Sequence, residues 1–99
     1  MSSKAKTVFV VQDCVESGSG DDYNFNCDAQ VSMSFGKAVS AAWCRFSENY
    51  AKAAGQPPSA EIKAEFDDLM SGEGGKCLYT IDATENTTVS VEILRREAV

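Results

Sequence analysis

The sequence predicts an α+β domain in which two helices pack on one face of a four-stranded, largely antiparallel sheet, in the order ββααββ. Three observations support this prediction. Residues 22–35 alternate between polar and apolar without an error, which is the period of a strand. Residues 36–54 place apolar side chains three and four positions apart, which is the period of a helix. The strand-like segments lie towards the two ends of the chain, with both helical segments between them, so there is no βαβ repeat.

The first two strands are expected to form a β-hairpin. Residues 7–15 are rich in Val and Phe, which favours a largely buried strand. Residues 16–21 are mostly Gly, Ser and acidic residues, a composition typical of a long and mobile connecting loop. The alternating segment 22–35 then supplies the second strand.

The alternation in residues 22–35 also predicts which side of this strand is buried. The odd positions are apolar and the even positions polar, so we expect the odd-numbered face on the core and the even-numbered face in water. A helix beginning at Asp28 is the alternative, because Val31, Phe35 and Val39 are spaced by four residues. The unbroken alternation favours the strand.

The longer helix is predicted over residues 36–54. Its apolar stripe is wide, and the charged side chains fall largely outside it. Gly55 suits the position just after a helix, where a left-handed backbone is common, and Pro57 and Pro58 prevent the helix from continuing.

A second, shorter helix is predicted to begin after Ser59, which is a suitable N-cap, with Glu61 in the first turn where the helix dipole favours a negative charge. The glycine-rich residues 72–75 end it. Its apolar face is expected to consist of Ile62, Phe66, Leu69 and Met70.

The last quarter of the chain is predicted to be another hairpin, with apolar side chains at odd positions in both strands. These side chains share one face only if odd positions pair with odd positions. A three-residue loop at residues 84–86 satisfies this condition and pairs Tyr79 with Val91. It also requires Asn86 to adopt the left-handed conformation that such loops use.

Length and composition predict one domain over residues 1–99, with residues 1–6 as a flexible tail. The apolar run at residues 8–11 is too short for a secretory signal, and no stretch approaches the ~20 apolar residues of a membrane span. A cytoplasmic location is therefore expected, in a host cell if the protein is phage-encoded. In that compartment the four cysteines, which form no Cys-x-x-Cys pair, are expected to be reduced and mostly buried. They are Cys14, Cys27, Cys44 and Cys77.

Composition excludes several classes of function. The chain has no His, which removes Ser-His-Asp and Cys-His catalysis and every zinc site that contains His. Its net charge of −6 disfavours direct binding to nucleic acid. No spacing marks a nucleophile, a general base or a set of metal ligands. We therefore expect no enzyme activity, no catalytic residues, no cofactor, no metal and no membrane association.

The negative charge is unevenly distributed, and acidic side chains are the candidate binding residues. Steering by opposite fields speeds association with a basic partner, and carboxylates can occupy Lys/Arg sites that otherwise hold nucleic acid. The expected partner is a basic protein or complex that binds nucleic acid. The candidate partner-binding residues are Asp21, Asp22, Asp28, Glu61, Glu65 and Asp68.

A short acidic chain without a catalytic signature resembles the small inhibitors that phages and mobile elements encode against host defence, such as anti-CRISPR proteins. It also resembles immunity proteins that neutralise nuclease toxins. This resemblance covers size and composition only, and it implies a non-catalytic inhibitor of a nucleic-acid-handling protein. Two alternatives stay open: an assembly subunit that self-associates, for example as a homodimer, through a sheet edge, and a small enzyme or ligand-binding domain with a concave polar pocket.

Overall fold

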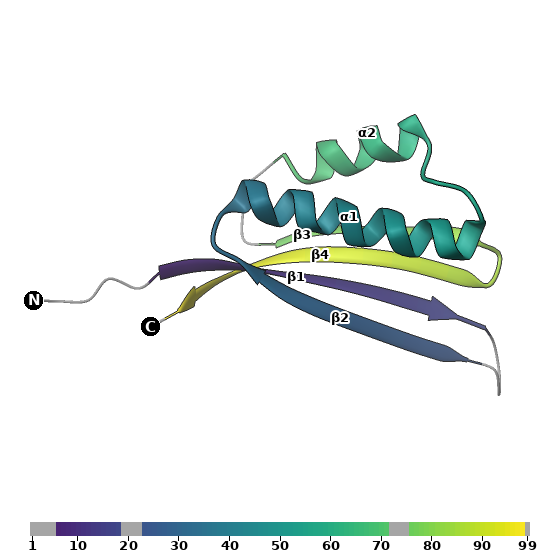
Figure 1. The fold of residues 1–99 in the computed structure, drawn as a ribbon, viewed down its shortest axis with the longest axis horizontal. Coiled ribbons are helices and arrows are strands. Elements are labelled where there is room, and N and C mark those ends of the chain that lie inside the picture. The colour runs from purple at the N-terminus through teal and green to yellow at the C-terminus, as the bar shows by residue number, and fades with distance from the viewer. Residues whose placement is uncertain (1–5, 19–22, 72–75, 99) are drawn as a thin grey trace, which may run out of the picture.

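The computed structural model describes residues 6–18, 23–71 and 76–98. These residues form β1 (Lys6–Ser17), β2 (Asn24–Ser32), α1 (Phe35–Ala54), α2 (Ala60–Leu69), β3 (Lys76–Thr84) and β4 (Thr87–Ala98). The four strands make one antiparallel sheet, and both helices lie on the same side of it (Figure 1). The predicted α+β class and the predicted order of elements are confirmed.

The first and the last strand occupy the centre of the sheet. The strand order is β2-β1-β4-β3, so β2 and β3 are the edges (Figure 1). β1 and β4 pair antiparallel along their whole length, from Lys6 opposite Ala98 to Ser17 opposite Thr87. Residues directly opposite each other in such a pair project to the same side. The register therefore assigns the residues of the four strands to a face under the helices or to an open face.

The hydrophobic core lies between the helices and the odd-numbered residues of β1, β4 and β3. Phe46 of α1 is fully buried, and its ring centroid lies 5.2 Å from that of Tyr79 on β3 and 6.3 Å from that of Phe66 on α2. The buried apolar residues are Val11, Ala38, Ala42, Phe46, Ile62, Phe66, Met70, Cys77, Tyr79, Val89, Val91 and Ile93.

Local signals set both ends of α1, and the C-terminal one was predicted, whereas the helix begins at Phe35, which was assigned to the preceding strand. The Ser34 hydroxyl accepts a hydrogen bond from the Lys37 N–H at 3.2 Å, which caps the first turn. Gly55 has a φ of 77°, and its N–H donates to the Ala51 carbonyl at 2.9 Å. This left-handed cap is the conformation that glycine adopts most easily.

The predicted start of α2 is confirmed as well. The Ser59 hydroxyl accepts from the Ile62 N–H at 3.3 Å, and Glu61 lies in the first turn. Ile62 and Phe66 are buried against the rest of the core, and Met70, which caps the C-terminal end, is buried with them, whereas Leu69, which was predicted on the same face, is exposed. α2 thus lies over β3 and beside α1, away from β2.

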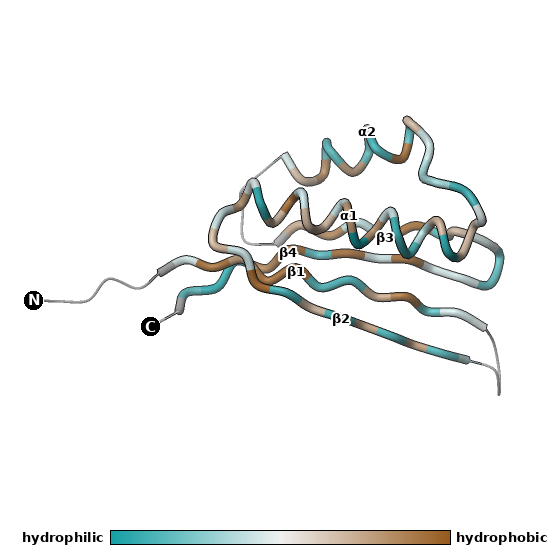
Figure 2. The backbone as a smooth tube through the Cα atoms, viewed as in Figure 1, coloured by the Kyte–Doolittle hydropathy of each residue, from teal (hydrophilic) through white to brown (hydrophobic). Residues whose placement is uncertain are grey.

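The prediction for the buried face of β2 is wrong. Val11 of β1 lies opposite Gln30, and Asp13 lies opposite Asp28, so even-numbered residues of β2 share the helix side with odd-numbered residues of β1. Figure 2 shows the alternating hydropathy that the sequence predicts. The polar side of that alternation faces α1, and the apolar side faces outward. The physical reason is that Arg45 of α1 binds the polar side chains of β2.

The second hairpin has the predicted faces but a different turn. Tyr79 pairs with Val91, as predicted, and all the apolar odd positions fall on the core side. The loop, however, has two residues, because Thr84 pairs with Thr87. An irregularity between Asp82 and Thr84 absorbs the resulting change of parity, as a β-bulge does. Asn86 has no left-handed backbone.

The expected N-terminal tail, residues 1–6, lies outside the described residues except for Lys6, which begins β1. The first strand is longer than predicted, so Glu16 and Ser17 belong to β1 and not to the loop that follows it.

Candidate functional site

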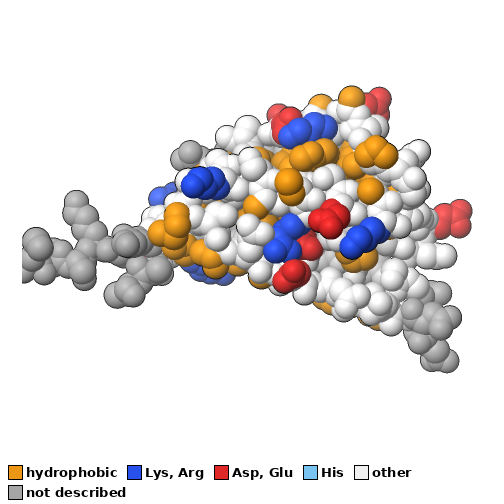
Figure 3. Space-filling model, viewed as in Figure 1, with side chains coloured by type: hydrophobic (Ala, Val, Ile, Leu, Met, Phe, Trp, Pro, Cys, Tyr) orange, Lys and Arg blue, Asp and Glu red, His pale blue; other side chains and the backbone are white. Residues whose placement is uncertain are grey.

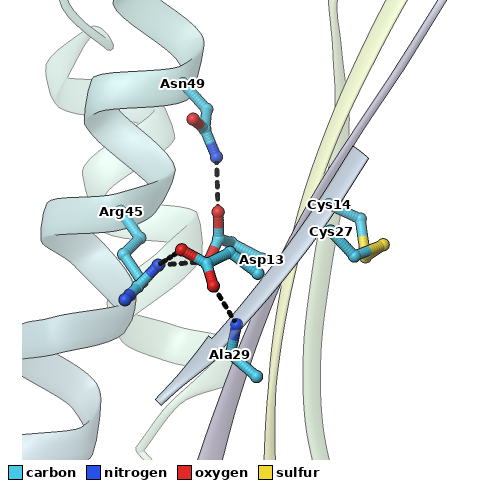
Figure 4. The surroundings of a disulfide bond; sticks show 7 residues. Asp13, Cys14, Cys27, Ala29, Arg45 and Asn49 are labelled. Atoms are coloured by element: carbon cyan, nitrogen blue, oxygen red, sulfur yellow. Dashed lines mark hydrogen bonds and ion pairs between the residues drawn. A yellow bond between two sulfur atoms is a disulfide. The ribbon is translucent and has the colours of Figure 1, made fainter. Parts of the chain in front are cut away.

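A polar cluster joins α1 to the two strands beneath it. Asp13 of β1 is only 7% exposed, and both of its carboxylate oxygens accept hydrogen bonds from α1. Arg45 donates to Oδ1 at 2.9 Å, and the Asn49 amide donates to Oδ2 at 2.8 Å (Figure 4). Arg45 and Asn49 are one helical turn apart, so they present their polar groups to the same strand residue. The helix thereby gives the buried Asp13 carboxylate both an ion pair and a hydrogen bond, which offset the cost of its burial.

Arg45 also reaches β2 and so connects three elements. Its Nε donates to Gln30 Oε1 at 2.7 Å, and its Nη1 forms an ion pair with Asp28 Oδ2 at 2.9 Å. The hydrogen bond from Arg45, together with one from the Ala29 N–H, lowers the pKa of Asp28. The two carboxylates in turn raise the pKa of Arg45. The cluster holds the polar face of β2 against the helix, and its carboxylate oxygens are already engaged in these bonds.

A shallow hollow lies beside this cluster, between α1 and β2. Its volume is about 270 Å³, and Asp28, Arg45, Glu48, Asn49 and Lys52 contribute to its lining. In the space-filling view of this side, basic and acidic side chains lie next to one another over the middle of the molecule (Figure 3). A surface of such mixed charge can make hydrogen bonds to a polar ligand. It has no excess of one sign that would select a phosphate or a cation.

The open face of the sheet is the second candidate site, and its character is apolar. Large apolar side chains are between 48% and 61% exposed at Tyr23, Phe25, Val31, Met33 and Leu78. Phe25 and Val31 lie on this face by the register of β2, and Leu78 lies on it by that of β3. Tyr23 and Met33 are the residues on either side of β2 in the sequence, so four of these five side chains lie on or next to that strand. Large apolar side chains that gather on an exposed surface mark interaction sites.

The two ends of the open face differ in charge. At one end Glu16 of β1 lies opposite Thr88 of β4, which pairs in turn with Asp82 of β3. The Thr88 hydroxyl donates to Asp82 at 2.8 Å. Desolvation and the neighbouring Glu16 carboxylate raise the pKa of Tyr23 at this end.

Residues that pair across the strands form a row on this face. At the end opposite to Glu16, one row contains Arg96 of β4 and Val8 of β1, and the next row contains Val10 and Leu94. Glu92 of β4 lies in the central row of the face. The open face therefore runs from an acidic, aromatic end to a basic, aliphatic end.

A disulfide lies on this same face, which corrects the expectation of four reduced thiols. Cys14 of β1 and Cys27 of β2 are directly opposite in the register and are bonded to each other. Figure 4 shows this bond on the side of the strands that faces away from Arg45 and Asn49. Cys27 and Cys44 are exposed and Cys77 alone of the four is buried, so the expectation of mostly buried cysteines is wrong as well. The bond forms because the register brings the two Cβ atoms within reach.

The structure does not bring the predicted acidic residues together. Asp21 and Asp22 lie outside the described residues. Asp28 lies on the edge strand β2, where it is paired with Arg45. The three others, Glu61, Glu65 and Asp68, lie on α2, which packs over β3 at the opposite edge of the sheet.

One of these carboxylates has a partner in the core. Glu65 accepts a hydrogen bond from the Tyr79 hydroxyl at 2.9 Å. Burial of the phenol and the neighbouring Glu65 carboxylate raise the pKa of Tyr79 to about 12. Glu65 therefore fixes α2 to β3, whereas Glu61 and Asp68 remain exposed on the helix.

Sequence reasoning missed the residues that form both candidate sites. Asp13 stands among Val residues in a predicted buried strand, which signals a carboxylate in need of a buried partner. Arg45 and Asn49, spaced by four in the predicted helix, were the available signal for that partner. The exposed side chains of β2 had no such signal, because their orientation follows from the pairing with β1.

Other features of the described ranges bear on function. Within residues 6–18, 23–71 and 76–98, no three His, Cys, Asp or Glu side chains cluster as metal ligands. No helix in these ranges is long and apolar enough to cross a membrane.

Comparison with known proteins identifies no relative: no protein-family model, no curated protein and no solved structure matches this chain.

Proposed function

We propose that this protein is a non-catalytic binding protein that acts by docking another polypeptide on the open face of its sheet. One observation carries the proposal: large apolar side chains stay about half exposed on that face, while the opposite face is filled by two helices. Burying a fully exposed side chain of this size is worth about 1.5–3 kcal/mol, and these side chains are about half exposed, so a partner gains about half of that figure from each one that it covers.

The charge of the open face supports a polypeptide partner over a phosphate-bearing one. Glu16, Asp82 and Glu92 are distributed over its rows, with Arg96 at one end. Nucleic acids and anionic membranes reward clustered Lys and Arg, whereas the three carboxylates would repel phosphate groups over the acidic end and the middle of this face. Protein interfaces combine apolar and polar side chains, and the open face has exposed apolar side chains on β2 and at Leu78, with the polar Gln12 and Glu92 between them in its central row.

The hydrogen bonds of the polar cluster under α1 suit a structural role for its charged residues. Asp13 accepts from two donors, and Arg45 spans both strands. These groups stabilise the orientation of β2 that turns Phe25 and Val31 outward.

A photo-crosslinking amino acid placed at Val31 tests the proposal in cells that produce the protein naturally. Ser40 provides the matched control position, because it is exposed on α1 on the other side of the molecule. We expect a covalent adduct to a polypeptide from position 31 that is missing from position 40. Identical adducts from both positions, or none from position 31, would overturn the proposal.

A second candidate is the inhibitor of a basic, nucleic-acid-handling protein, of the anti-defence or immunity type. The observation that favours it is the exposure of Glu61 and Asp68 on α2. A crosslinker at Glu61 would then capture a nucleic-acid-binding protein, and excess duplex DNA or RNA would abolish the adduct. An adduct that persists with the competitor would exclude blockade of a nucleic-acid site.

A further inference from the structure

We propose that the open face binds the same face of a second copy of this chain, in a two-fold dimer whose facing strands run antiparallel. This inference rests on the proposed function and names its partner. The size of the face, the order of its rows and the charges at its two ends support this dimer.

The face is large enough for a stable dimer. β2 contributes 9 residues, and at ~3.3 Å per residue this strand is about 30 Å long. Four strands at ~4.8 Å spacing span about 19 Å, so the flat area approaches 600 Å² before side-chain relief is added. Typical specific interfaces bury ~800 Å² per partner, which is the same scale. Sheets that pack face to face in β-sandwiches use surfaces of this kind.

The rows of the open face have a defined order along β1. From the acidic end they contain Glu16, then Cys14, Gln12, Val10 and finally Val8. The row of Glu16 adds Phe25, Thr88 and Asp82, and the row of Val8 adds Arg96. The row of Gln12 lies midway and adds Ala29, Glu92 and Leu78.

Charge selects one of the two simple ways to stack such faces. If the two-fold axis ran along the strands, like ends would meet, with Arg96 near its copy and Glu16 near its copy. If the axis runs across the strands through the row of Gln12, opposite ends meet. Arg96 then faces the partner's Thr88, with the partner's Glu16 and Asp82 on either side. Opposite charges placed across an interface fix its register, whereas like charges in contact oppose binding.

The apolar side chains also complement one another in the crossed arrangement. In this arrangement β2 lies over the partner's β2. Val31 then faces the partner's Cys27, which belongs to the disulfide. Phe25 faces the C-terminal end of the partner's β2, next to the partner's Met33. An isologous interface repeats each of these contacts twice.

The same axis brings one unfavourable pair together. Glu92 lies in the central row and therefore approaches its own copy. Replacing it should strengthen the dimer, which is an outcome that an unrelated interface would not produce.

Sedimentation equilibrium of the purified, oxidised protein tests the dimer directly. The wild type is expected to dimerise, and Arg96→Glu to weaken dimerisation by about tenfold or more, since reversing a facing charge replaces attraction by repulsion. Arg95→Glu is the matched control, because Arg95 is exposed next to Arg96 but projects to the helix side. Adding Glu16→Lys and Asp82→Lys to Arg96→Glu should restore dimerisation, and Glu92→Gln should tighten it.

Three results would overturn the inference. The first is a wild-type monomer at every concentration, and the second is a dimer that Arg96→Glu leaves intact, as pairing through a sheet edge would. The third is a monomer that instead floats with vesicles of phosphatidylcholine and phosphatidylserine. The crosslink from Val31 separates this failure from failure of the proposed function. An adduct to a different polypeptide from a monomeric chain would refute the dimer and leave the binding function standing.

Discussion

The substitution Arg45→Met is the most informative test of how the polar cluster holds the molecule together. It removes the guanidinium that joins α1 to Asp13 on β1 and to Asp28 and Gln30 on β2. Met keeps much of the aliphatic side chain, so packing against the neighbouring residues changes little.

The expected loss follows from the burial of each partner. The Asp13 side chain is 10% exposed and would keep only the Asn49 amide as a hydrogen-bond donor. Removing one partner of a buried ion pair costs about 3–5 kcal/mol. The Arg45 side chain is itself 25% exposed, so water replaces part of the interaction, and we expect a loss of about 2 kcal/mol. Asp28 is exposed, and Asp28→Asn should therefore cost much less.

Guanidinium chloride unfolding, followed by Trp43 fluorescence with the disulfide oxidised, measures these losses. Arg45→Met should lower the midpoint while leaving the denaturant dependence unchanged. The double variant Asp13→Leu/Arg45→Met should recover much of the loss, because no unpaired carboxylate then remains buried. Equal midpoints for Arg45→Met and Asp28→Asn, or a double variant less stable than Arg45→Met alone, would contradict this account of the buried ion pair.

Three other predictions concern single features of the fold. The pKa of Tyr79 is raised from 10.0 to about 12 in the folded protein, so the neutral phenol stabilises the fold fully below pH 10, and this stabilisation is lost as the pH rises towards 12. Tyr79→Phe should therefore weaken the fall of the urea midpoint with rising pH, and an unchanged fall would contradict the assignment. Cys14→Ser/Cys27→Ser opens a link across a sequence separation of 13 residues, which should cost about 3 kcal/mol in chemical unfolding; equal midpoints for oxidised wild type and variant would exclude this. Gly55 has a positive φ and Gly36 lies in open space at the start of α1, so Gly55→Ala should destabilise by about 1 kcal/mol and Gly36→Ala should not; equal changes in melting temperature would argue against the left-handed cap.

The helices could be predicted because their signals are local. The Ser59 cap, the Gly55 terminator and the apolar spacing all act within one or two turns, and so does the Ser34 cap, which the prediction did not use. None of these interactions depends on where the rest of the chain lies. The number of strands and their positions along the chain followed from equally local patterns of alternation, but the order of the strands within the sheet did not.

The orientation of β2 could not be predicted from its own pattern. Alternation defines two faces, but the pairing with β1 decides which of them meets the helices. Here odd-numbered residues of β1 lie opposite even-numbered ones of β2, as Val11 and Gln30 illustrate. The same parity argument, applied only to the second hairpin, gave the right faces there and the wrong turn, because a bulge near Ala83 changed the count.

The disulfide shows the same dependence on long-range geometry. Cys14 and Cys27 are unremarkable in the sequence and become neighbours only when the register of β1 and β2 is known. The acidic residues failed to converge for a related reason. α2 is placed by its apolar side chains over β3, whereas Asp28 belongs to the other edge strand.

The central position of β1 and β4 has a consequence for how the chain folds while the ribosome synthesises it. β1 is the first of the four strands to be synthesised. It pairs along its whole length with β4, the last of the four, as Thr7 opposite Glu97 illustrates. Until β4 emerges, the nascent chain has a two-stranded ribbon whose apolar residues lack their main covering, and such ribbons are marginally stable. Completion of the core therefore waits for the synthesis of β4, and in that period chaperones compete with aggregation for the unpaired edge of β1.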